Sequence, residues 1–402
     1  MMKKAYCTIV LMAVLASLSS PTWAGVKLKI SEDTDIDLGF RLQTLFRATD
    51  NKDGTTGDSA EDFLVRRARI RLGGNVTKWM SFFLQTEAAN DSGTGLDMRV
   101  IDAFVTLNLN PLAQIYLGEN MAPAGRQITT SSGALMAMDR PNITNYNLTW
   151  GLNGRIQYNT ANFPNGNLDL SGEVNVRDLG ATLFGFHSFS DMVHLKYYAG
   201  VYNGIQNSGG NKKRYTGRVQ MNFFDPEPGY YNLSTYVGEK RTIGVGFSYD
   251  AQNDIAEDVI KGNIDYGWWS ADLFADLPLG PGFITAEGGY QHLDLDNATE
   301  LITDASGLGI QNAELTQGEG WYTQIGYLIE SWKLQPWAAY SKWNATDDRG
   351  SFYDWQVGLT YFFKGNNANI KAGYEYLKSD KNMGASNEDS IKSFLVGFYV
   401  TY

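Results

Sequence analysis

The fold is decided by one stretch near the start of the chain, Ile36-Asp37-Leu38-Gly39-Phe40-Arg41-Leu42-Gln43-Thr44-Leu45-Phe46-Arg47. Its even-numbered residues are almost all apolar, and Asp37, Arg41, Gln43 and Arg47 lie on the opposite face. A repeat of two residues is typical of a β-strand that shows one face to an apolar environment and the other to water. We therefore expect an amphipathic strand at the start of the folded domain.

The same alternation returns along the whole chain. A second strand places Ala68, Ile70 and Leu72 opposite three arginines. Further strands are expected at 80–88, 101–108, 193–201, 214–221, 271–277, 321–327, 353–361 and 394–402, with Ile101, Ala103 and Val105 on the apolar face of their strand. A membrane-crossing strand needs only about 9–11 residues, whereas a helical span needs roughly 20 apolar ones. The pattern predicts an all-β protein, a transmembrane antiparallel β-barrel.

The connections between these strands differ in length. Short ones are expected at 110–112, 278–281, 330–332 and 364–368, and longer polar ones at 48–61, 90–98, 120–148, 203–213, 250–261, 292–318, 343–351 and 379–390. In bacterial barrels the short turns are periplasmic and the long loops extracellular. Counting every candidate gives 18 strands, or 16 if the hairpin formed by 150–158 and 167–175 belongs to the long loop. A barrel of either size encloses a water-filled lumen.

The first 24 residues have the features of a secretory signal peptide. Lys3 and Lys4 precede an apolar run from Ile9 to Leu18, and cleavage is expected after Ala24. The mature domain would then be 25–402, in the bacterial outer membrane, without the only cysteine, Cys7. Loss of two lysines changes the net charge from −11 to −13, which argues against nucleic acid as a partner.

Several motifs occur in a characteristic order. They are Phe63-Leu64-Val65-Arg66-Arg67-Ala68-Arg69, Ile101-Asp102-Ala103-Phe104-Val105, Tyr116-Leu117-Gly118 followed by Ala122-Pro123-Ala124-Gly125, and then 177–180, 198–204 and 215–218. They resemble the F-x-x-R-R-A-R strand, the D-A-Y/F segment, the opening of the constriction loop and later blocks of the phosphate-selective porins O and P.

This resemblance implies a homotrimer of 16-stranded barrels, each with its own pore narrowed by a third extracellular loop. Here that loop would run from Asn120 to about Tyr146 and carry Arg126, Asp139 and Arg140. The match at 177–180 favours the smaller strand count and makes 150–175 an insertion in the loop. One departure is Met121, which stands where the family has a lysine before the loop proline.

Arginines on the inner face of the first two strands suggest an anion path, because guanidinium groups offer bidentate contacts to phosphate and carboxylate oxygens. The alternative is that these arginines pair with lumen carboxylates, including Asp169 and Glu173, as in a general or cation-preferring porin. The expected pore-lining residues are Arg41, Arg47, Arg67, Arg69, Arg71, Arg126, Arg140, Arg218, Glu87 and Asp102.

Aromatic residues allow two interpretations. Trp79, Trp150, Trp321, Trp332, Trp337 and Trp355 are expected in the interfacial girdles. A sugar-stacking track inside the pore would use Tyr198, Tyr202, Trp268 and Tyr399.

The functional expectation is passive diffusion of small hydrophilic solutes, chiefly anions such as phosphate, through a barrel surrounded by outer-membrane lipid. A scaffolding barrel that houses a partner protein is the alternative. No motif around His187, His194 or His292 indicates an enzyme, and nothing in the sequence indicates a cofactor or a metal.

Overall fold

The computed structural model describes residues 25–50, 59–90, 97–146, 176–204, 212–258, 260–298, 301–302, 317–379 and 390–402. The predicted signal peptide, Trp150, Asp169, Glu173 and the hairpin of 150–175 lie outside these residues. Among the described segments, no helix is long and apolar enough to cross a membrane.

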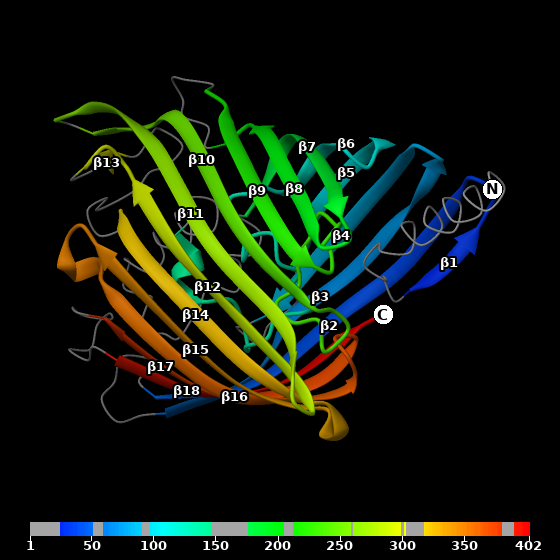
Figure 1. Cartoon of the computed structure of the whole chain (residues 1–402). Coiled ribbons are helices and arrows are strands. Elements are labelled where there is room, and N and C mark those ends of the chain that lie inside the picture. Colours follow the sequence, from blue (N-terminus) through cyan, green and yellow to red (C-terminus); the bar gives the residue numbers. More distant parts are fainter. Residues whose placement is uncertain are drawn as a thin grey trace.

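The described segments form one antiparallel sheet that closes on itself (Figure 1). Its strands are β1 (Val26–Lys29), β2 (Asp35–Asp50), β3 (Ser59–Thr77), β4 (Met80–Asn90), β5 (Asp97–Asn110), β6 (Ala113–Met121), β7 (Arg177–Ser190), β8 (Val193–Tyr202), β9 (Arg214–Phe224), β10 (Thr242–Asp258), β11 (Gly262–Leu279), β12 (Gly282–Asp294), β13 (Leu301–Ile302), β14 (Gly318–Ile329), β15 (Leu334–Ala345), β16 (Phe352–Lys364), β17 (Ala368–Ser379) and β18 (Ser390–Thr401). The described residues also include three short 3-10 helices, at Asn142–Tyr146, Glu330–Trp332 and Asp348–Gly350.

The wall of the barrel has 16 strands, β2 to β12 and β14 to β18. β18 pairs with β2 from Ser393↔Thr49 to Thr401↔Arg41, which closes the sheet and leaves no unpaired edge in the wall. β6 pairs directly with β7, so no hairpin from 150–175 stands between them and the smaller count is correct. β1 pairs with the periplasmic end of β2 beyond the last residues of β18.

Wall strands keep the predicted two-residue period. On β18, Phe394, Phe398 and Val400 are exposed, whereas Leu395 and Tyr399 are buried inside the barrel. The exposed side chains face the membrane, where apolar groups meet hydrocarbon rather than water. The alternation read from the sequence is thus the difference between the lipid face and the lumen face.

Two bulges break the predicted pattern. On β3, Arg67 pairs with Gln43 of β2 and Val65 pairs with the next residue, Thr44, so Arg66 is the extra residue of the bulge. Both Arg66 and Arg67 are buried. On β5 a similar irregularity buries Ile101 beside Asp102, so the placement of Ile101 on the apolar outer face was wrong. A bulge adds one residue to a strand and reverses the facing of those that follow.

The two rims also depart from the expected lengths. A long loop was predicted at 250–261, but β10 continues to Asp258 and β11 begins at Gly262. Conversely, β9 ends at Phe224 and β10 begins at Thr242, so 225–241 is a long connection at the rim that otherwise carries short periplasmic turns. This connection starts and ends at the periplasmic rim and folds into the lumen, so we call it the periplasmic insert.

Candidate pore constriction

The inner faces of β2 and β3 carry a dense group of arginines. Arg41 stands opposite Arg69, and Gln43 opposite Arg67, in the register of the two strands. Arg41, Arg47, Arg67, Arg69 and Arg71 are all at most 7% exposed and face the interior. The pairing of β2 with β3 therefore places these five side chains along one side of the lumen.

Carboxylates accompany several of these arginines. Arg69 Nε donates to Glu87 Oε2 at 2.7 Å, and Arg47 lies 3.6 Å from Asp62. Arg67 Nη2 donates to Asp139 Oδ1 at 3.0 Å, and Arg66 Nε donates to Asp139 Oδ2 at 2.8 Å. The group is therefore partly neutralised by acids from the wall and from the loop at 122–146.

Sequence reasoning missed Arg66. The signal was present, because the apolar residues switch from odd numbers at Phe63 and Val65 to even numbers at Ala68 and Ile70. Such a change of phase indicates a bulge, and a bulge between two arginines turns both inward.

Residues 122–146 form loop 3, which folds into the lumen as predicted. Wall side chains hold its backbone: Lys371 Nζ donates to Ala137 O at 3.0 Å, and Tyr399 Oη donates to Met138 O at 3.0 Å. Gln43 Nε2, on β2 beside β18, donates to Ser132 O at 2.8 Å. Three adjacent strands of the wall, β17, β18 and β2, thus hold residues 132–138 of loop 3.

Arg41 lies beneath loop 3. It donates to Ser132 Oγ at 2.6 Å and to Ser131 Oγ at 3.3 Å. A Cβ added at Gly133 would lie 2.5 Å from Arg41 Nη2, so a larger residue here would displace the guanidinium end of Arg41.

The two loop arginines predicted from the sequence have different surroundings. Arg140 donates from Nε to Gln127 O at 2.9 Å and ties the two arms of loop 3 together. Arg126 donates to both oxygens of Glu227, at 2.8 and 3.0 Å, and stacks 3.8 Å from the Phe274 ring. Both side chains serve the packing of loop 3.

The remaining predicted wall residues are also paired. Asp102 Oδ1 accepts from Arg177 Nε at 2.9 Å, and Arg218 donates to Asp272 at 2.6 and 2.8 Å. These pairs lie inside the barrel, and each reaches across one strand, from β5 to β7 and from β9 to β11, so they brace the wall.

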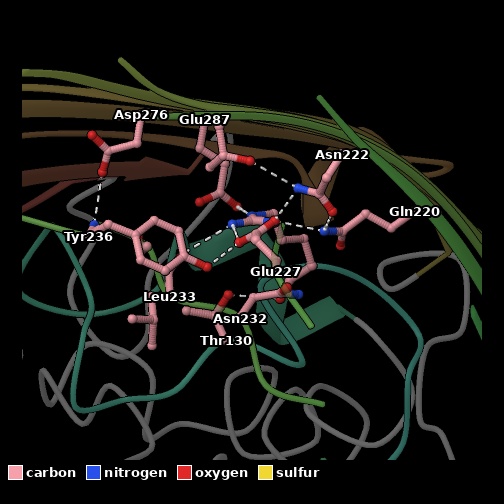
Figure 2. Close-up of polar contacts among 12 residues, drawn as sticks. Thr130, Gln220, Asn222, Glu227, Asn232, Leu233, Tyr236, Asp276 and Glu287 are labelled. Atoms are coloured by element: carbon pink, nitrogen blue, oxygen red, sulfur yellow. Dashed lines mark hydrogen bonds and ion pairs between the residues drawn. The ribbon is translucent and has the colours of Figure 1, made fainter. Parts of the chain in front are cut away.

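Glu227, on the periplasmic insert, is the centre of the contact between the insert and the barrel. It accepts from Arg126, from Gln220 at 2.7 Å, from Asn222 at 2.8 Å and from the Tyr236 hydroxyl (Figure 2). Burial acts to raise the pKa of Glu227, but Arg126, Lys196 and the Tyr236 hydroxyl hold it below its ordinary value. A buried carboxylate with this many donors is well satisfied in its charged form.

The insert and loop 3 meet by backbone pairing. Thr130 and Asn232 form a parallel bridge, in which Asn232 N donates to Thr129 O and Ser131 N donates to Asn232 O, both at 2.9 Å. Lys196 on the wall adds a bond of 2.7 Å to Asn232 Oδ1. The lumen is therefore narrowed from both rims, by two segments that touch.

Aromatic residues inside the barrel hold these segments. Tyr230 packs against Phe184, Tyr198 and Tyr116, with ring centroids 5.5, 5.1 and 4.5 Å away. Tyr198 donates to Tyr230 O at 2.6 Å. Such clustered rings add packing energy beyond the area that they bury.

The aromatic track predicted for sugar stacking is used in this packing. Tyr198, Tyr202, Trp268 and Tyr399 are all buried inside the barrel. Trp268 Nε1 donates to Ala124 O at 3.0 Å, as Tyr399 does to Met138. Trp337 was predicted in an interfacial girdle but is buried in the lumen against Met138, so that assignment was wrong.

Met121 also has a structural explanation. It is 4% exposed and belongs to an apolar cluster with Ala124, Ile128 and Trp268 beneath loop 3. A lysine ammonium at this position would lie among apolar side chains, which is costly. The departure from the family's lysine therefore fits this chain's own loop packing.

Below the meeting point of the two segments lies a cavity of about 870 Å³ at the periplasmic rim. Five basic side chains line it, Arg41, Arg71, Lys240, Lys333 and Lys364, against three acidic ones, Glu227, Glu239 and Glu330. Glu227 is already bonded to Arg126. The lining of this periplasmic mouth thus has two more basic than acidic side chains, although the chain as a whole is acidic.

A closed barrel with an apolar outer face, a polar lumen and an infolded loop defines a porin of the outer membrane. The chain belongs to the phosphate-selective porin O and P family, which it matches over residues 36–402.

Solved outer-membrane proteins share the fold. The anion-selective porin from Comamonas acidovorans superposes with a TM-score of 0.59 at 12% identity, covering 92% of this chain and 100% of that one. OmpT of Vibrio cholerae, in its trimer form, superposes with a TM-score of 0.54 at 14% identity, covering 92% and 100%.

Among curated proteins, an uncharacterized protein of Aquifex aeolicus (strain VF5) is 21% identical over 308 residues. The alignment covers 71% of this chain and 64% of that protein, so this chain spans less than two thirds of the relative's length.

Proposed function

We propose that this porin is an anion-preferring channel for small hydrophilic solutes and has no enzymatic activity. The observation that carries the proposal is the periplasmic cavity, in which five basic side chains face three acidic ones. Arg41 and Arg71 connect this mouth to the arginine-rich inner face of β2 and β3. Charge of one sign along a narrow path raises the local concentration of the opposite ion.

The carboxylates bonded to Arg66, Arg67 and Arg69 limit this preference. They cancel part of the positive charge at loop 3, so we expect the basic side chains that line the periplasmic mouth to contribute to the selectivity as well. The sequence left two alternatives, an arginine path for anions and arginines paired with carboxylates. The proposal combines them: the arginines at loop 3 are paired with carboxylates, and the periplasmic mouth has an excess of basic side chains.

The test is the zero-current potential of the purified protein in a planar bilayer under a KCl gradient. We expect the sign that marks chloride as the more permeant ion. A potential of the opposite sign would replace the proposal with a cation-preferring porin. Intact barrels without any conductance would favour a scaffold that houses a partner.

We further propose that the chain is exported with cleavage after Ala24 and assembles as a homotrimer. The trimer form of the Vibrio cholerae OmpT structure and the family resemblance support this assembly. Intact mass spectrometry of the outer-membrane protein should give a chain that begins at Gly25 and a complex of three copies. A monomer or an uncleaved chain would contradict the respective part.

A further inference from the structure

The periplasmic insert presents two different faces. Tyr230, Asn232 and Ser234 are buried against the wall and loop 3, whereas Tyr231 and Leu233 between them are only partly buried. Tyr231, Leu233 and the partly buried Val237 line the periplasmic cavity. In Figure 2 the Leu233 side chain points away from the polar contacts of Glu227. The insert therefore gives the cavity an apolar wall.

This apolar wall lines the same cavity as the basic groups. Arg41, Arg71 and Ser131 line the cavity together with Leu233 and Tyr231. A path for hydrated inorganic ions gains nothing from apolar side chains, because such ions keep a polar shell. Apolar surface combined with a few charged donors is instead the composition of sites for organic ligands.

The size of the cavity agrees with this composition. Its volume of about 870 Å³ far exceeds that of a bare inorganic oxyanion, and small-molecule sites usually measure about 300–1,000 Å³. An apolar body could lie against Leu233, Val237 and Tyr231 while its charged end met the basic groups.

We propose that the cavity between the periplasmic insert and loop 3 is a subsite for organic carboxylates that carry an apolar or aromatic body. The inference rests on the proposed anion preference and adds the class of solute. The carboxylate meets Arg41 and the neighbouring basic groups, and the body contacts the insert. Inorganic phosphate has no apolar body, so it cannot make the contacts with the insert.

The experiment compares three probes on the reconstituted wild-type channel in a chloride background. Benzoate, inorganic phosphate and uncharged benzyl alcohol are added to both sides, and the loss of ion current is measured against concentration. We expect benzoate to reduce the current at a concentration at least about fivefold lower than phosphate, and benzyl alcohol to be weaker than both. Equal effects of benzoate and phosphate, or of benzoate and benzyl alcohol, would overturn the inference.

A variant locates the effect. Leu233→Ser combined with Val237→Ser should weaken the benzoate effect about fivefold or more, because it removes most of the apolar wall, and should leave the phosphate effect unchanged. Leu112→Ser is the matched control, since Leu112 is an exposed residue of a turn at the same rim. Equal benzoate effects in the double variant and the control would overturn the assignment to this cavity.

The zero-current potential, recorded in the same bilayers, separates this inference from the proposed function. A channel that prefers chloride but does not distinguish benzoate from phosphate refutes only the organic-carboxylate subsite. A channel that prefers potassium refutes both.

Discussion

Loop 3 and the periplasmic insert enter the lumen from opposite rims and are held in different ways. Many anchors of loop 3 are its backbone carbonyls, such as those of Ala137 and Met138, which accept from wall side chains. The insert also uses its backbone, but many of its contacts converge on two of its own side chains, Glu227 and Tyr230. The position of the insert should therefore depend on single residues far more than that of loop 3.

The largest expected effect is that of Glu227→Ala. Removing one partner of a buried ion pair costs about 3–5 kcal/mol, because Arg126 stays buried without its bidentate acceptor. We expect a lower unfolding temperature of the purified porin and a larger single-channel conductance as the insert loosens. Glu239→Ala, at an exposed position on the same insert, is the control for the unfolding temperature, and an equal loss of unfolding temperature in the two variants would contradict the anchoring role.

Asp139→Asn should have the next largest effect, on selectivity rather than on stability. Asp139 neutralises Arg66 and Arg67, and its side chain is 32% exposed, so the cost in stability should be smaller than that of Glu227→Ala. Loss of this charge should move the zero-current potential toward stronger anion preference. The exposed Asp33→Asn serves as control, and an unchanged potential in Asp139→Asn would show that loop 3 does not border the ion path.

Gly133→Ala should act through Arg41. Its new Cβ would lie 2.5 Å from Arg41 Nη2, so the flexible guanidinium end has to move while the backbone remains. We expect an altered conductance with an unfolding temperature close to that of the wild type. Gly217→Ala, whose Cβ would lie 4.0 Å from Tyr198 O, should change neither. A wild-type conductance in Gly133→Ala would place Arg41 outside the ion path.

The smallest expected effect is a dependence of selectivity on pH through Lys240. Burial lowers the pKa of Lys240, and Glu227, Asp225 and Glu239 offset this only in part. The ammonium therefore loses its charge at a lower pH than an ordinary lysine, and anion preference should decline earlier as pH rises above neutral. Lys240→Gln should remove this part of the decline, as measured by the zero-current potential between pH 7 and about 10. An identical pH profile in both proteins would contradict the role of Lys240.

The barrel itself could be predicted from the sequence because each strand faces lipid on one side and the aqueous lumen on the other, which makes apolar and polar residues alternate. Ile70 faces lipid and Arg71 faces the lumen, and that contrast is written in neighbouring residues. The infolding of loop 3 and its arginines followed from the resemblance to the family. The inward orientation of Arg66 could also have been predicted, because the apolar residues change from odd to even numbers beside it.

The periplasmic insert could not be predicted, for a physical reason. Its place in the lumen depends on contacts across long sequence distances, such as Glu227 with Arg126 and Tyr236 with Asp276. The connection from β9 to β10 contains Pro226, Pro228 and Gly229, which indicate a turn but not its direction. Nothing in the local pattern distinguishes a segment that projects into the periplasm from one that folds inward.

The most direct test of the account is the reactivity of a cysteine at Leu233. Cys7 is the only cysteine of the sequence, so the wild-type protein under the same treatment is the control. Leu233→Cys in bilayers should react with an anionic thiosulfonate reagent faster than with its cationic counterpart, with a stepwise loss of current, because solutes pass the insert in a positive field. No loss of current, or faster reaction with the cationic reagent, would contradict the account.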